Sequence, residues 1–170
     1  MKKVVYYTIY LFVIALIQLT LIDYISIFNI KPNIFLCFVV SIALLCGTLE
    51  GAIIGFFAGL IQDITSGKII GLYALLGLYL GIVMGAVNKR LYRENIIISI
   101  FFTFISTIVY ELIVCLSMVI SGNQIDMLYA LWNIILPESV YNSVIGIPMY
   151  IIATRLSSQL EYGLKTLKRY

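Results

Sequence analysis

The chain alternates long apolar stretches with short polar breaks, and the stretches carry hydrophobic residues on every side instead of alternating with period two. A transmembrane helix takes about 20 such residues to cross a hydrocarbon core of about 30 Å. Strands of a membrane β-barrel would alternate apolar and polar residues. The pattern therefore predicts an all-α polytopic membrane protein with a bundle of six helices, at about residues 4–22, 32–46, 48–64, 69–87, 95–120 and 137–156.

Two segments outside these helices differ from them in composition. Residues 121–136 contain Tyr129 and Trp132, whose rings favour the headgroup region, so we expect an interfacial helix there. Residues 157–170 form a basic tail. Its pattern fits either a helix along the inner leaflet or a simple stop-transfer cluster.

Composition and charge support the membrane assignment. With 62% hydrophobic and 11% charged residues, the chain has too few polar groups to cover a soluble globule. Six spans with a cytoplasmic amino terminus place nine of the eleven basic residues inside, in agreement with the positive-inside rule. Five spans, the main alternative, would weaken that asymmetry. The inner residues are Lys2, Lys3, Lys89, Arg90, Arg93, Arg155, Lys165, Lys168 and Arg169, and the outer ones are Lys31 and Lys68.

Two ladders of glycines spaced four residues apart stand in neighbouring predicted helices. They comprise Gly47, Gly51, Gly55 and Gly59, and then Gly77, Gly81 and Gly85. Glycine in a helix costs about 1 kcal/mol relative to alanine, so each ladder predicts that another backbone approaches along its stripe. We interpret the hairpin of the third and fourth helices as the chief helix-docking surface. Which ladder packs internally, and which meets a partner or a second copy of the chain, stays open.

Two carboxylates occupy positions where their negative charge is unfavourable unless other groups stabilise it. Glu111 falls inside the fifth predicted helix, where an ionised carboxylate facing lipid would cost a few kcal/mol. It is expected either to contact a neighbouring helix or subunit, or to be a protonated acid within the bundle. Asp63 lies one turn beyond Gly59, at the negative end of its helix dipole. Lys68, backbone amides of the following turn, or a partner would compensate it, and its alternative role is to organise that turn.

Several chemistries are excluded by what the sequence lacks. The chain has no histidine, no phosphate-binding loop and no G-x-G-x-x-G motif, which removes Ser-His-Asp, zincin and nucleotide-binding sites. The cysteines show no C-x-x-C spacing and are interpreted as packing residues. We expect no metal, no cofactor, no nucleic-acid partner and no enzymatic activity. A membrane transferase that uses Asp63 and Glu138 as acid and base is the weakest alternative, because two carboxylates without basic or metal-binding side chains beside them do not complete such a site. The cysteines are Cys37, Cys46 and Cys115.

Three motifs together resemble one family. The central motif consists of Gly55, Phe56, Gly59, Leu60, Asp63, Ser66, Gly67, Gly71, Ala74 and Leu75. Lys31, Pro32 and Asn33 precede the second predicted helix, and Pro137 and Asn142 stand in the last one. The spacing is similar to that of the MreD family of rod shape-determining proteins, in its central signature, its basic-Pro-Asn start and its Pro-x4-Asn pattern. The resemblance covers most of the chain.

The resemblance implies a non-enzymatic scaffold in the cytoplasmic membrane of a bacterium, within the complex that elongates rod-shaped cells. It implies binding to the single-span protein MreC and a link between cytoskeletal filaments and peptidoglycan synthases. It also implies a fold similar to the substrate-binding subunits of energy-coupling-factor vitamin transporters, and such a subunit is the alternative function. A vitamin site would need polar and aromatic groups that converge on an outer pocket, whereas the outer loops here are short.

Overall fold

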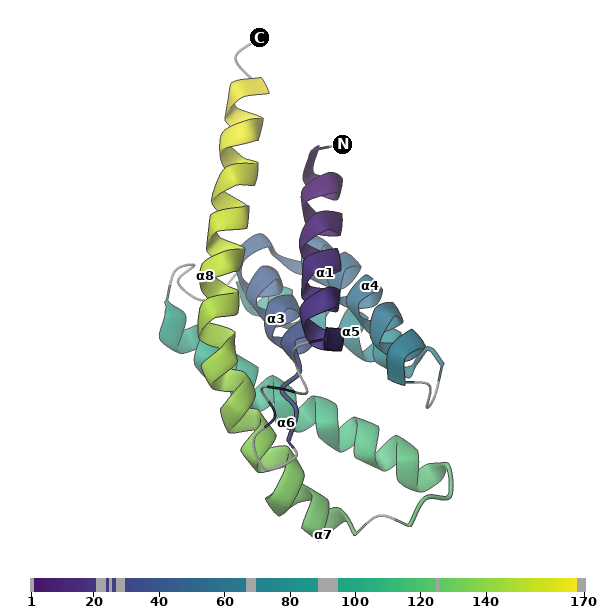
Figure 1. Ribbon diagram of the computed structural model, residues 1–170. Coiled ribbons are helices and arrows are strands. Elements are labelled where there is room, and N and C mark those ends of the chain that lie inside the picture. Colours follow the sequence, from purple (N-terminus) through teal and green to yellow (C-terminus); the bar gives the residue numbers. More distant parts are fainter. Residues whose placement is uncertain are drawn as a thin grey trace.

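Helices dominate the structure, a computed structural model that describes residues 2–20, 24, 26, 30–66, 70–88, 95–124 and 126–167 (Figure 1). This confirms the all-α class over those residues. The elements are α1 (Lys2–Thr20), α3 (Ile34–Cys46), α4 (Thr48–Ser66), α5 (Leu72–Asn88), α6 (Ile96–Ile120), α7 (Met127–Ala130), the π-helical η1 (Leu131–Ile135) and α8 (Leu136–Leu167).

Three helical segments are long and apolar enough to cross a membrane, namely Thr48–Ser66, Ile96–Ile120 and Met127–Ser158. Three shorter apolar segments accompany them, at Val5–Thr20, Ile34–Cys46 and Leu72–Val87. These six segments correspond to the six predicted helices, while the number that cross the bilayer stays a prediction. The first residues of α1 and the last turns of α8 lie at the same end of the molecule (Figure 1), as an even number of crossings requires.

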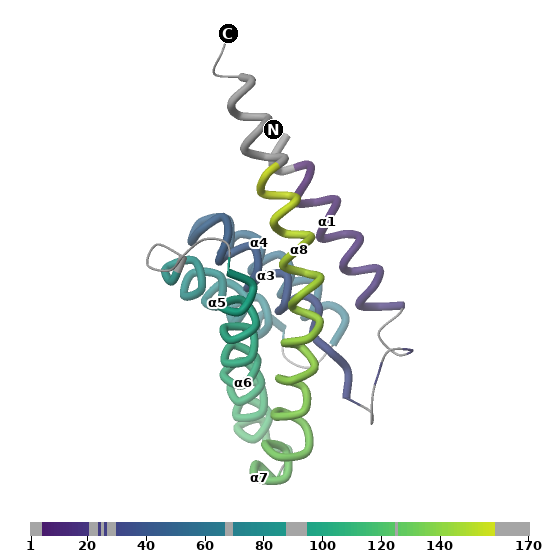
Figure 2. The backbone as a smooth tube through the Cα atoms, turned by 90° about the vertical axis from the view of Figure 1, so that its left-hand side faces the viewer, coloured from purple at the N-terminus to yellow at the C-terminus, as the bar shows by residue number. Residues whose placement is uncertain are grey.

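Helix α3 forms the centre of the bundle. Every residue from Ile34 to Leu45 is buried, and α3 packs against α1, α4, α5, α6 and α8. The long α8 runs beside α6 in its first half and reaches the level of α1 in its second half (Figures 1 and 2). A helix that is apolar on all sides is stable only when other helices or lipid surround it, and here the protein itself surrounds α3.

Both ends of α3 are set by specific residues. Asn33 caps the first turn, since its Oδ1 accepts a hydrogen bond from the Leu36 N–H at 3.1 Å. Gly47 ends the helix with φ of 100°, a conformation that suits glycine because a Cβ would be strained there. The Gly47 N–H donates to the Ala43 carbonyl at 3.0 Å. The turn is so short that α4 begins at the next residue, Thr48.

The last helix begins earlier than the sequence analysis expected. The span expected from Pro137 is part of one helical stretch that begins at Met127, and an interfacial position for the segment at 121–136 stays a prediction. Asp126 caps it by accepting hydrogen bonds from the Leu128 and Tyr129 N–H groups. Pro137 has no N–H and its ring conflicts with the carbonyl four residues earlier. The π-helical turn η1 lies directly before it, and such a widened turn accommodates that conflict.

The glycine stripes of α4 and α5 face each other. An added Cβ on Gly55 would overlap the carbonyl of Gly77, and one on Gly81 would overlap the carbonyl of Gly51. The same contact repeats toward both ends of the pair, where Gly59 meets the backbone of Tyr73 and Ala74, and Gly85 meets Thr48. The two stripes thus form one antiparallel seam inside the chain, with backbone against backbone.

We expect Gly55→Ala to destabilise the bundle by about 1–3 kcal/mol, because the new methyl group forces α4 and α5 apart. Gly146→Ala is the matched control, because its added Cβ would make a tight contact of 3.3 Å with the Thr103 side chain but would not overlap a backbone, and alanine favours the helix by about 1 kcal/mol. Thermal unfolding in detergent measures both variants. Equal melting temperatures for the two would contradict the seam.

Candidate functional site

Asp63 joins the end of α4 to the start of α5. Its side chain is 3% exposed, and its Oδ1 and Oδ2 accept hydrogen bonds from the Tyr73 and Ala74 N–H groups, each at 3.0 Å. The N–H groups in a helix's first turn have no partner within the helix and carry the positive end of its dipole. The carboxylate is therefore compensated by α5, although the dipole of its own helix disfavours it. The backbone amides that compensate it belong to the first turn of α5, and not to the turn directly after α4 that the sequence analysis considered.

A second contact at this end ties the hairpin to α6. The Tyr110 hydroxyl donates to Gln62 Oε1 at 3.3 Å, and the Tyr110 ring stacks on Tyr73 with centroids 6.2 Å apart. Gly71 precedes α5 with φ of 91° and nothing within 4 Å of an added Cβ, so its backbone conformation, not crowding, favours glycine. Gly67 and Lys68 lie outside the described residues.

The motifs from the two halves of the chain meet in a buried polar cluster. The Asn33 N–H donates to Asn142 Oδ1 at 2.8 Å, across 109 residues of sequence. Asn142 Nδ2 donates to Thr107 Oγ1 at 3.3 Å and lies 3.5 Å from Glu138 Oε1. The Cys37 thiol donates to the Asn142 carbonyl at 3.3 Å. Asn142 thus joins α3, α6 and α8 at one point, and its side chain is fully buried.

Gln18 extends this cluster to α1. Its Nε2 donates to the Pro32 carbonyl at 3.1 Å, and its Oε1 accepts from the Ile34 N–H at 2.8 Å. The sequence analysis did not single out Gln18, although a lone amide within an apolar helix was a signal for it. Pro32 is buried and Lys31 is exposed, so the basic residue of the motif lies outside the core.

Helices α6 and α8 pack in a register that the contacts define. Thr103 of α6 lies against Gly146 of α8, and one helical turn further along α6, Thr107 lies against Asn142 of α8. Moving four residues forward in α6 therefore moves four residues back in α8, as in an antiparallel pair. One further turn in the same register pairs the position of Glu111 in α6 with that of Glu138 in α8. Glu138 is 8% exposed, and Glu111 is half-buried, so Glu111 faces the protein at least in part.

Many of the predicted site residues that the structure describes fall into three groups. The glycines of the two ladders meet each other, Asp63 holds the start of α5, and Asn33 meets Asn142. Phe56 is half-buried and packs edge-to-face on Phe57. Among the described residues, no three side chains from His, Cys, Asp and Glu gather to hold a metal ion. The ladder glycines, Asp63, Asn33 and Asn142 thus all join helices.

These observations define a class: an all-helical, apolar protein whose motifs serve contacts between helices. A family model described as rod shape-determining protein MreD matches residues 1–159. The chain belongs to the MreD family, as the three motifs indicated. No curated protein and no solved structure matches the chain. The family determines rod shape as a membrane protein of the rod-shape complex and is not known for enzymatic activity.

Asp63→Ala is expected to destabilise the fold by about 2 kcal/mol or more, because two buried N–H groups lose their acceptor. Asp126→Ala, which removes the exposed cap of α7, is the matched control and is expected to cost about 1 kcal/mol or less. Thermal unfolding of both variants in detergent tests the difference. An Asp63→Ala protein as stable as the Asp126→Ala protein would argue against a structural role for this carboxylate.

Asn142→Leu is expected to lower stability by about 1–3 kcal/mol, since the buried Asn33 N–H loses its acceptor. Asn133→Leu changes an exposed asparagine on the same helical stretch, whose amide bonds only to the Tyr129 carbonyl among the contacts described, and is expected to be near neutral. Protease resistance and melting temperature in detergent report on both proteins. Similar losses in both would contradict the role assigned to Asn142.

Proposed function

We propose that this chain is a non-enzymatic scaffold of the bacterial elongation complex, which binds MreC within the cytoplasmic membrane. Through MreC it would couple cytoskeletal filaments to peptidoglycan synthases. The observation that supports a scaffold most is the use of the motif residues: Asp63, Asn33 and Asn142 all form bonds between helices. A protein whose polar motif residues bond its own helices together offers partners a rigid surface.

The orientation that we propose places both termini in the cytoplasm. The positive-inside bias supports this, because nine of the eleven basic residues then lie inside. The outer end of the bundle would carry Lys31, Asp63 and the helix start at Met127. Exposed rings at Tyr129 and Trp132 suit the outer headgroup region, where amphipathic aromatic side chains gather.

The alternative, a substrate-binding subunit of a vitamin transporter, finds less support. Two grooves on the described surface, between α1 and α4 and between α5 and α6, are lined mainly by apolar side chains. A vitamin with charged groups needs several convergent polar partners. Several polar side chains described in the core, among them Asn142 and Tyr110, instead bind other side chains or the backbone of the bundle. The likeness to transporter subunits in fold remains a prediction.

Affinity purification of the tagged chain from its native membrane is expected to recover MreC, and depletion of the chain is expected to turn rod-shaped cells round. The physical reason is that a rigid helical scaffold with no catalytic centre acts by retaining its partners. Mass spectrometry and microscopy measure the two effects. Recovery of paired ATPases with a coupling subunit, from cells that keep their shape, would instead support the transporter alternative.

A further inference from the structure

An apolar groove of about 730 Å³ lies between α1 and α4. Its α1 wall includes Leu11 and Phe12, and its α4 wall extends from Leu49 to Ile64. At 1.5 Å per residue, that wall is about 22 Å long, so the groove extends over most of the length of a hydrocarbon core. Both helices run away from the side of the molecule on which the termini lie, and α4 starts lower than α1 (Figure 1).

The two faces of α4 have different uses. The glycine face, with Gly51, Gly55 and Gly59, is buried against α5. On the groove face, Ile53 and Phe57 are 49% and 51% exposed. The seam thus holds α4 in place from one side and leaves large side chains available on the other. Such a supported face is suited to receive another helix without any rearrangement of the bundle.

Charge distinguishes one end of this groove. Among the residues whose side chains the structure describes, Glu50 is the charged one that lines the groove, and it lies in the first turn of α4. In the orientation proposed above, this is the cytoplasmic end. Single-span membrane proteins carry an excess of Lys and Arg on that side. A negative charge at the inner end of an apolar groove is complementary to a transmembrane helix flanked by basic residues.

We propose that the groove between α1 and α4 receives the single transmembrane helix of a partner, with a cytoplasmic Lys or Arg of that partner beside Glu50. The inference rests on the proposed scaffold function and adds the docking surface to it. The partner helix lies lengthwise against both walls, and its side chains fill the space between Phe12 and Phe57. A helix is 10–12 Å wide, so part of its surface remains in contact with lipid.

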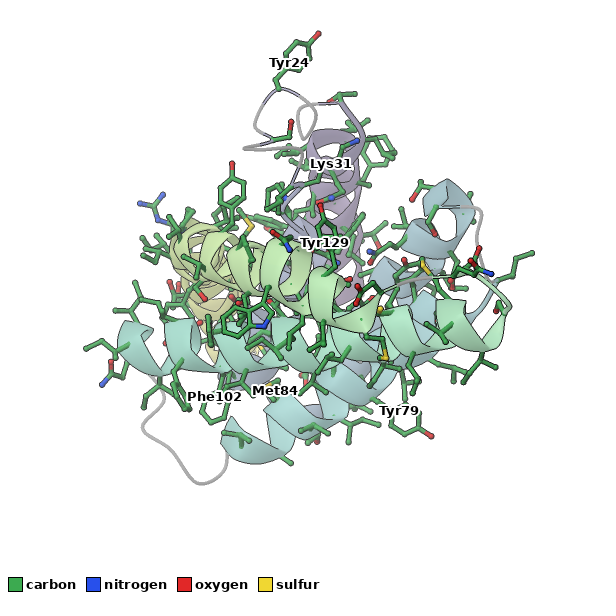
Figure 3. The ribbon with its side chains drawn as sticks, turned by 90° about the horizontal axis from the view of Figure 1, so that it is seen from below. Tyr24, Lys31, Tyr79, Met84, Phe102 and Tyr129 are labelled. Carbon is green, nitrogen blue, oxygen red and sulfur yellow. The ribbon has the colours of Figure 1, made fainter. Side chains whose placement is uncertain are left out.

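The groove between α5 and α6 provides the comparison. It is smaller, at about 230 Å³, and none of the described residues that line it is charged. Two of its polar side chains bond within the bundle, since Ser106 donates to Met84 Sδ and Tyr110 to Gln62 Oε1. Tyr79 on its rim is 61% exposed and points away from the bundle (Figure 3). This face therefore serves as the matched control.

The first experiment places a photo-crosslinking amino acid at Phe57 or at Tyr79 in the full chain, co-expressed with MreC of the same organism. MreC is the probe for a single-span partner. We expect at least about tenfold more MreC adduct from position 57 than from position 79, because only the first position contacts the docked helix. More adduct from position 79, or adducts at position 57 with a second copy or with lipid alone, would overturn the assignment.

The second experiment tests the charge. Glu50→Lys is expected to reduce MreC recovery about tenfold, which corresponds to about 1.4 kcal/mol. Exchange of the partner's basic residues before its span for Glu is expected to restore recovery. Unchanged size-exclusion and melting profiles establish that the variant is folded, and a variant that fails this control is replaced by Glu50→Gln, for which a smaller loss is expected.

The outcomes separate this inference from the function on which it rests. If the unmodified chain retains MreC but the groove variants behave like the control variants, the docking surface is wrong and the scaffold function stands. If the unmodified chain retains no MreC, both are rejected. Loss of recovery in Glu50→Lys without rescue by the exchanged partner also counts against the charge pairing.

Discussion

The contact of backbone with backbone between α4 and α5 underlies the rest of the structure. Lipid tails are as apolar as leucine, so hydrophobic burial does little to drive membrane helices together, and close packing takes its place. Glycines at 51, 55, 77 and 81 bring the two helices to a separation that no side chain at these positions would allow. That separation and the antiparallel register bring Asp63 within hydrogen-bond distance of the start of α5.

Hydrogen bonds between polar groups in the core fix how the packed helices are aligned along their axes. An unsatisfied donor or acceptor in a low-dielectric interior is costly, so each buried bond between helices penalises sliding and rotation. Asn142 contributes most, because it bonds to residues from α3 and α6 at the same level. Gln18 does the same between α1 and the start of α3. Four helices are thereby fixed around a small number of amide groups.

This division of roles explains how an apolar bundle can act through the surfaces that it offers to other helices. The interior faces are occupied by glycine contacts and by amide hydrogen bonds, which leaves the outer faces apolar and regular. In a membrane those faces meet lipid or other helices, and a groove between two of them selects by shape and by the charge at its end. Membership of a shape-determining family agrees with such a role.

The sequence alone determined the helical class, the approximate positions of the helices and the family. These properties are local, since they follow from apolar length, from glycine spacing and from short motifs. The sequence also indicated that Asp63 needed compensation and that the ladders needed a facing backbone. Only the tertiary structure decided that the ladders face each other, that the backbone of α5 supplies the partner of Asp63, and that Asn33 meets Asn142. Those pairings join residues up to 109 positions apart, and no local pattern contains the rotation and register of one helix against another.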